Sequence, residues 1–239
     1  MKEAIAPVKN VIATQDVFDS LAGRSYGVPG IGLIHGSTGL GKTTAVTHLF
    51  NQVNGIYVVA RATDSATSLL SRIMDELGAD PMPRVSRMVD HIIEQMSMHE
   101  RSLFIDEADH LMRDVRMLET VRDIYDATEV PVVLIGMDQI ARRISSRKQF
   151  YNRISEWAEF RPADLEDVMI MAETLLEDGI QVDPDLLDQL RKSAGGEMRR
   201  LAIGLGRIEK LAKTNELDFV TCAHWGDQPF FGSSYRPGM

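Results

Sequence analysis

The segment 36–43, with the sequence GSTGLGKT, fits every fixed position of the phosphate-binding loop pattern G-x-x-x-x-G-K-[ST]. The apolar run 31–34 precedes it, and the stretch 44–50 follows it with helical spacing, so the motif has a strand–loop–helix context. Its glycines let the backbone turn sharply and direct N–H groups, together with the positive end of the helix, toward phosphate oxygens. The pattern therefore predicts a nucleotide site.

Two side chains of this motif have distinct predicted roles. Lys42 reaches the β- and γ-phosphates, and the hydroxyl of Thr43 binds Mg²⁺. The predicted cofactors are therefore ATP and Mg²⁺. The motif and the residue after it supply these predicted nucleotide contacts: Gly36, Ser37, Thr38, Gly39, Leu40, Gly41, Lys42, Thr43 and Thr44.

A second chemical motif, 102–110 (SLFIDEADH), is an apolar strand that ends in acidic residues. At the carboxyl end of a strand, Asp106 would bring its carboxylate to the Mg²⁺ shell, and Glu107 would orient the water that attacks the γ-phosphate. The letters DEAD also occur in a class of helicases. That class needs a Ser-Ala-Thr motif downstream, whereas here Ser-Ala-Thr occupies 65–67, upstream of the acids. The helicase interpretation is therefore disfavoured.

The rest of the chain alternates predicted strands with predicted helices, which indicates a parallel α/β sheet. After the fourth strand, 132–135, Asp138 is placed either to sense the γ-phosphate or to cap the next helix. The following stretch turns basic, which indicates an anionic partner nearby or, alternatively, a solvated face. Its basic residues are Arg142, Arg143, Arg147, Lys148 and Arg153.

Length and composition set the outer limits. A chain of 239 residues suits one core domain with an appendage, which we place as an α/β domain over 1–162, a helical domain over 163–220 and a flexible tail over 221–239. The single Cys222 excludes an intrachain disulfide framework, and no apolar run is long enough to span a membrane. We therefore expect a cytoplasmic protein with no membrane partner. The net charge of −9 argues against coating nucleic acid by bulk positive charge.

Taken together, the motifs resemble those of the AAA+ ATPases. The resemblance is carried by the two motifs above, the strand ending at Gly136, the stretch 152–154 and the Gly-Gly-Glu-Met-Arg sequence at 195–199, which matches a lid helix. More narrowly, the chain is similar to the phage Mu B transposition protein and the related ATPases of bacterial transposons over about 8–211. The fold that this implies is a P-loop AAA+ parallel sheet flanked by helices, with a small C-terminal helical lid domain.

The resemblance also implies functional residues. Arg153 matches the arginine finger that precedes the last strand, and Arg199 matches the sensor arginine of the lid, so the implied catalytic residues are Lys42, Glu107, Arg153 and Arg199. Two features depart from the family. Met137 stands where the family often has Asn, and the N-terminal helix-turn-helix domain of the Mu B protein has no counterpart.

The implied function is that of an ATP-hydrolysing regulator of DNA transposition, which assembles on duplex DNA as a ring or helical filament and recruits a transposase. DNA contact would have to come from the ATPase core, where the candidates are Arg61, Arg72, Arg84 and Arg87, with Arg113 and Arg116 next. The alternative is a nucleotide-gated adaptor that acts on protein partners without DNA.

Overall fold

The computed structural model describes residues 1–232. Its strands are β1 (Ile31–His35), β2 (Ile56–Val59), β3 (Leu103–Asp106), β4 (Val132–Gly136), β5 (Ile154–Glu159), β6 (Gln181–Val182) and β7 (Phe219–Val220). Its helices are α1 (Lys9–Ala22), α2 (Lys42–Gln52), α3 (Ala66–Glu76), α4 (Val85–His99), the 3-10 helix η1 (Ala108–Arg113), α5 (Val115–Thr128), α6 (Ile140–Ser145), α7 (Lys148–Tyr151), α8 (Leu165–Leu175), α9 (Pro184–Ala194), α10 (Met198–Thr214) and α11 (Cys222–Trp225).

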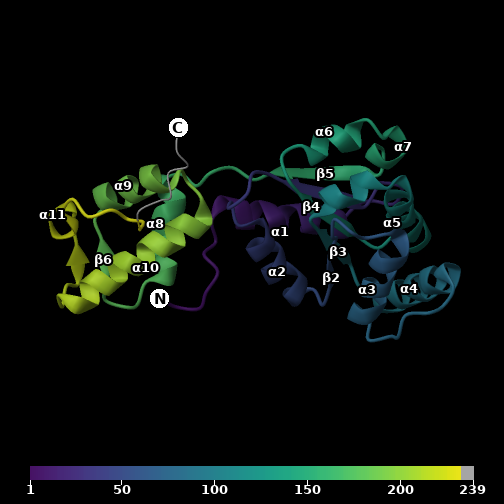
Figure 1. The fold of residues 1–239 in the computed structure, drawn as a ribbon, viewed down its shortest axis with the longest axis horizontal. Helices are drawn as coiled ribbons and strands as arrows, with labels where there is room; N and C mark the ends of the chain where they lie inside the picture. The colour runs from purple at the N-terminus through teal and green to yellow at the C-terminus, as the bar shows by residue number, and fades with distance from the viewer. Residues whose placement is uncertain (233–239) are drawn as a thin grey trace. The chain divides into compact units, whose positions relative to one another are not determined.

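Five strands form a parallel sheet in the order β2-β3-β4-β1-β5 (Figure 1). Because the strands are parallel, their carboxyl ends meet at one edge. The phosphate-loop motif follows β1 at this edge, and the acidic motif ends β3 there. The order places β4 between these two strands, so the sheet brings together motifs that lie far apart in the sequence.

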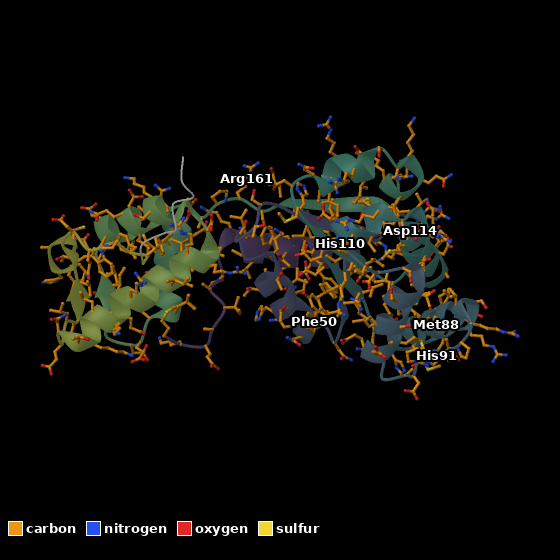
Figure 2. The ribbon with its side chains drawn as sticks, in the orientation of Figure 1. Phe50, Met88, His91, His110, Asp114 and Arg161 are labelled. Carbon is orange, nitrogen blue, oxygen red and sulfur yellow. The ribbon has the colours of Figure 1, made fainter. Side chains whose placement is uncertain are left out.

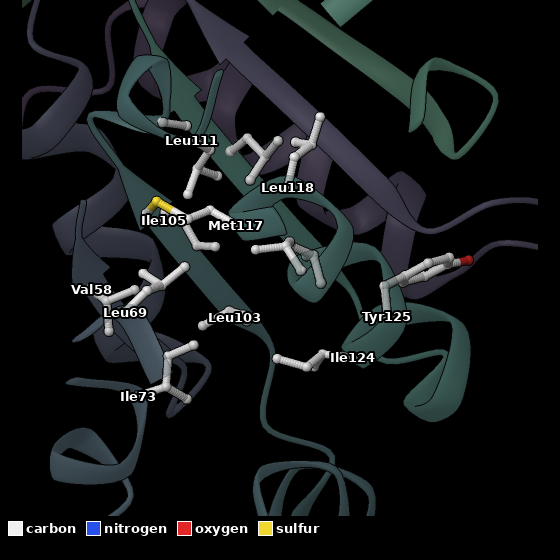
Figure 3. Packing of buried hydrophobic residues seen from close by; sticks show 14 of the residues in the cluster. Val58, Leu69, Ile73, Leu103, Ile105, Leu111, Met117, Leu118, Ile124 and Tyr125 are labelled. Atoms are coloured by element: carbon white, nitrogen blue, oxygen red, sulfur yellow. The ribbon is translucent and has the colours of Figure 1, made fainter. Parts of the chain in front are cut away.

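Both faces of the sheet are buried, which explains why its inner strands read as continuous apolar runs. On one face, Leu103 and Ile105 pack with α3, α4 and α5, and Met88 of α4, labelled in Figure 2, is 1% exposed. Figure 3 shows this cluster from close by. On the other face, the ring of Phe104 lies against Phe18 of α1, with ring centroids 5.8 Å apart.

The α-carbons form two compact units. One comprises Ala13–Ser37 and Lys42–Phe160; the other comprises Met1–Ile12, Thr38–Gly41 and the chain from Arg161 onward. The second unit, called the helical unit below, has its own core, in which α8, α9 and α10 pack together and β6 pairs with β7. The division passes through the phosphate-loop motif. The predicted boundary at 162 falls one residue after the chain re-enters the second unit, and the three-part division remains a prediction.

Residues 221–232 differ from the predicted flexible tail. Thr221 caps α11, and Trp225 and Phe230 are 5% and 7% exposed. Their rings stack with centroids 4.7 Å apart and belong to the core of the helical unit. Burial of two large aromatic rings orders this stretch, despite its glycine and proline content. The last seven residues of the predicted tail lie outside the described residues.

Helix α1 begins before Thr14, a residue of a type that often caps helices. Thr14 is buried inside the helix, and the helix starts at Lys9, whose backbone N–H donates to the Asp167 carboxylate at 3.0 Å. The cap is thus supplied by a side chain more than 150 positions away. None of the helices in the described part of the chain is long and apolar enough to cross a membrane.

Candidate nucleotide-binding site

The phosphate loop has the backbone that its glycines predict. Gly39 and Gly41 have φ of +86° and +88°, in the left-handed region that favours glycine. A Cβ atom on Gly36 would lie 2.8 Å from the carbonyl oxygen and the Cβ of Phe160, so no larger residue fits there. These are the conditions under which successive N–H groups can face an anion.

Lys42 is half-buried at the start of α2. Its ammonium donates to the carbonyl oxygens of Gly36 at 2.6 Å and Ser37 at 2.8 Å, which are residues of its own loop. Burial lowers the pKa of Lys42 from its usual value, while the negative charges of Asp106 and Asp138 oppose that shift. The ammonium therefore stands within the loop that the motif assigns to phosphate.

Thr43 and Asp106 meet as the two motifs require. The Thr43 hydroxyl donates to Oδ2 of Asp106 at 2.8 Å, and the backbone N–H of Glu107 donates to Oδ1 at 2.7 Å. Hydroxyl and carboxylate oxygens are hard ligands that fit Mg²⁺, which is usually held by one or two carboxylates together with phosphate oxygens. No cluster of three or more His, Cys, Asp or Glu side chains within 1–232 could hold a metal ion.

Tyr57 is a member of this site that the sequence motifs do not identify. From β2, its hydroxyl donates to the same Oδ2 of Asp106 at 2.8 Å. Burial, reinforced by the charge of Asp106, raises the pKa of Tyr57 above its usual value, so the hydroxyl keeps its proton as a donor. The sequence shows Tyr57 only as part of an apolar strand. Its role depends on β2 lying next to β3, which is a property of the fold.

Glu107 follows β3 with an exposed side chain and a φ of +53°. This left-handed conformation is uncommon for a residue with a side chain. The carboxylate is exposed beside a buried one, Asp106, which is the placement that a residue acting on water needs.

Asp138 lies at the carboxyl end of the sheet and contacts the phosphate loop directly. Its Oδ2 accepts a hydrogen bond from the Ser37 hydroxyl at 2.5 Å. The side-chain cap considered as its alternative role is not seen, because Gln139 occupies the N-cap of α6 and has no side-chain cap. The neighbouring Met137 donates its backbone N–H to Asp109 at 2.6 Å.

Within the helical unit, the segment Thr38–Gly41 contacts the start of α10. The backbone N–H of Arg199 donates to the carbonyl of Gly39 at 3.4 Å, and the carboxylate of Glu197 lies 3.2 Å from the position of a Cβ on Gly39. The side chain of Arg199 is exposed. The backbone of Arg199, the residue predicted as the sensor of the lid, thus contacts the phosphate loop at Gly39.

Arg153 lies at the amino ends of the sheet strands, whereas the acidic motif lies at their carboxyl ends. Its carbonyl accepts from the N–H of Ile31, the first residue of β1, whereas the phosphate loop follows the last residue of that strand. The guanidinium forms a two-point contact with Asp126 at 2.7 and 3.2 Å, which raises the pKa of Arg153. Asp126, Arg153 and the loop 24–29 line a pocket of about 670 Å³.

The predicted DNA-binding arginines differ in their surroundings. Arg61, Arg84 and Arg87 are exposed. Arg72 is engaged within the protein, since its guanidinium pairs with the Asp64 carboxylate and donates to the Val59 carbonyl at 2.6 Å. Only 20% of its side chain is exposed. Arg72 is thus held by its own unit in a way that Arg61, Arg84 and Arg87 are not.

Comparisons with known proteins agree with this geometry. Residues 26–144 match the family described as "AAA domain". A "Potential ATP-binding protein" of Staphylococcus aureus is 25% identical over 229 residues, covering 80% of this chain and 84% of that protein.

Solved structures are similar over most of the chain. The ORC2 protein of Aeropyrum pernix has a TM-score of 0.69 and 16% identity, with 94% of this chain and 68% of that chain covered. Cdc6p of Pyrobaculum aerophilum has a TM-score of 0.65 and 16% identity, with 92% and 66% covered. The ORC1 protein of Aeropyrum pernix, solved in complex with DNA, has a TM-score of 0.59 and 18% identity, with 93% and 64% covered. The chain thus spans about two thirds of these proteins, and the predicted α/β fold with a parallel sheet flanked by helices is confirmed.

Proposed function

We propose that the protein binds ATP with Mg²⁺ and hydrolyses it. The observation that carries this proposal is the meeting of the two motifs at Asp106, whose Oδ2 accepts from the Thr43 hydroxyl at 2.8 Å. Lys42 and the loop N–H groups would bind the phosphates, and Thr43 and Asp106 would hold Mg²⁺. The cation would supply charge neutralisation on the phosphates. Glu107 would orient the attacking water, and Asp138 and Arg199 would respond to the bound nucleotide.

We further propose that hydrolysis requires assembly of several copies. Phosphoryl transfer gains strongly from a guanidinium placed on the γ-phosphate, and a partner molecule can supply it. Arg153 suits this role because it lies at the end of the sheet away from the acidic motif of its own chain, beside a pocket of about 670 Å³. The assembly would be a ring or a helical filament.

At the level of biology, we propose that the assembly binds duplex DNA and regulates transposition by choosing target sites and recruiting a transposase. The support is the motif resemblance, together with the likeness to the ORC1 protein of Aeropyrum pernix, which was solved in complex with DNA. The exposed arginines Arg61, Arg84 and Arg87 would supply phosphate contacts, and the exposed Arg113 and Arg116 are the next candidates for the same role.

The test of this proposal is ATP turnover with and without duplex DNA, in the wild-type protein and two variants. Glu107→Gln should keep ATP binding and lose turnover, because Glu107 acts on the water, whereas Lys42→Ala should weaken ATP binding itself. Turnover that persists in Glu107→Gln would contradict the catalytic assignment. Turnover that does not respond to DNA would instead favour an adaptor that acts on protein partners.

A further inference from the structure

Asp106 is held by three donors that come from three separate places in the chain. Its Oδ2 accepts from the hydroxyls of Thr43 in α2 and Tyr57 in β2, both at 2.8 Å. Its Oδ1 accepts from the backbone N–H of Glu107 at 2.7 Å. The residue Asp106 is 5% exposed, so these three donors, rather than water, determine the orientation of its carboxylate.

Packing fixes the ring of Tyr57 independently of its hydroxyl. The ring stacks on Phe50 with centroids 4.8 Å apart and an interplanar angle of 12°. Phe50, labelled in Figure 2, belongs to α2. Its ring in turn lies near that of Phe104 in β3, with ring centroids 6.4 Å apart. The phenol is therefore held against the helix that carries Thr43 and beside the strand that carries Asp106. Removal of the hydroxyl alone should leave the ring in place.

We propose that Tyr57 is a positioning residue of the magnesium site: its hydroxyl fixes the orientation in which the Asp106 carboxylate faces the cation. This inference rests on the proposed binding of ATP and Mg²⁺. A hydroxyl has one proton and two lone pairs, so Thr43 can donate to Asp106 and still offer a lone pair to a cation. Tyr57 would not bind the cation itself. Its hydroxyl donates to the ligand Asp106, as the hydrogen-bond partners of metal ligands commonly do.

The substitution Tyr57→Phe isolates the hydroxyl. We expect Mn²⁺ affinity in the presence of ADP to fall about tenfold, the lower end of the range for loss of such a partner. The free Mn²⁺ signal in electron paramagnetic resonance measures this affinity without any need for turnover. ADP affinity in EDTA should stay unchanged, because Lys42 and the loop N–H groups do not depend on Tyr57. Tyr26→Phe is the matched control, since Tyr26 is 99% exposed.

The outcomes separate the inference from the function on which it rests. Equal Mn²⁺ affinity in Tyr57→Phe and in the wild type would overturn the positioning role and leave the nucleotide site intact. A loss of metal-free ADP affinity as large as the loss of Mn²⁺ affinity would also overturn it, because that pattern indicates general damage to the fold. If the wild-type protein failed to bind Mn²⁺ with ADP at all, the proposed function would fail first.

Discussion

At the residue scale, Glu107 combines an exposed carboxylate with a strained backbone. Of the three other glutamates with positive φ, Glu100 and Glu129 are the C-caps of α4 and α5, where this conformation is common. Glu107 has no such role, since it directly follows β3. Strain of this kind persists where the surroundings impose it, and it often marks functional sites.

The strain predicts that substitutions of Glu107 affect the stability of the protein and its ATP turnover differently. Glu107→Gly should be more stable than Glu107→Ala by about 1 kcal/mol, because glycine avoids the left-handed penalty of roughly 1–2 kcal/mol, part of which its greater unfolded-state entropy cancels. Both variants should lose ATP turnover. Urea unfolding midpoints and a phosphate-release assay measure the two effects. The same pair of changes at Glu100 should show the stability difference with turnover intact. A Glu107→Gly protein less stable than Glu107→Ala would show that the backbone there is relaxed.

At the scale of elements, the sequence was sufficient for the sheet strands and for most long helices, because their apolar patterns are local. It was insufficient where a distant group decides the outcome. Helix α1 begins at Lys9 because Asp167 accepts its N–H, and Tyr57 joins the site only because β2 pairs with β3. The order of the strands and the pairing of Arg72 with Asp64 likewise arise from tertiary packing.

The ordered C-terminal segment gives a prediction at this scale. Trp225→Ala should destabilise the helical unit by about 3 kcal/mol, the cost of removing a buried aromatic ring that packs in a core. Asp227→Ala, two residues further on and exposed, should leave stability nearly unchanged. Thermal unfolding followed by circular dichroism compares the two variants. Equal melting temperatures would mean that the stacked pair of Trp225 and Phe230 contributes little, and that the segment behaves as the predicted tail.

At the scale of the whole molecule, the position of Arg153 predicts that an active site needs residues from two copies. Arg153→Ala should fold and bind ATP normally but lose turnover. Addition of the Glu107→Gln protein, which has an intact Arg153, should restore part of the activity, because it can supply the missing guanidinium across the contact. Phosphate release measured over a range of mixing ratios tests this. Arg147→Ala, an exposed arginine of the same segment, is the control.

The absence of rescue at any ratio would indicate that Arg153 acts within its own chain. The two-point contact with Asp126 would then be its principal role, as a structural ion pair. Such a pair is partly exposed on both sides and would stabilise the fold only modestly. Unfolding midpoints of Arg153→Ala and Asp126→Ala would in that case be lowered together, whereas a trans-acting arginine predicts little change in either.

DNA binding is a property that we expect only of the assembly. A single chain carries a net charge of −9 and repels DNA overall. A ring or filament repeats a few exposed arginines in every subunit along the phosphate backbone, so many weak contacts add up. Binding should therefore require ATP, weaken steeply with salt and show little sequence preference, because phosphate contacts carry no base information.

Fluorescence anisotropy with duplex DNA, at several salt concentrations and with or without ATP, measures these properties. Combined replacement of Arg61, Arg84 and Arg87 by alanine should weaken binding to all duplexes alike. It should also flatten the salt dependence of binding, because fewer phosphate contacts release fewer counterions from the DNA. Replacement of Arg142, Arg143 and Arg147 removes the same charge from another exposed segment and is the matched control. If that control weakened binding instead, the DNA contact would lie on α6 and α7. Equal affinity without nucleotide, or no binding under any condition, would contradict a role in transposition and favour a protein-directed adaptor.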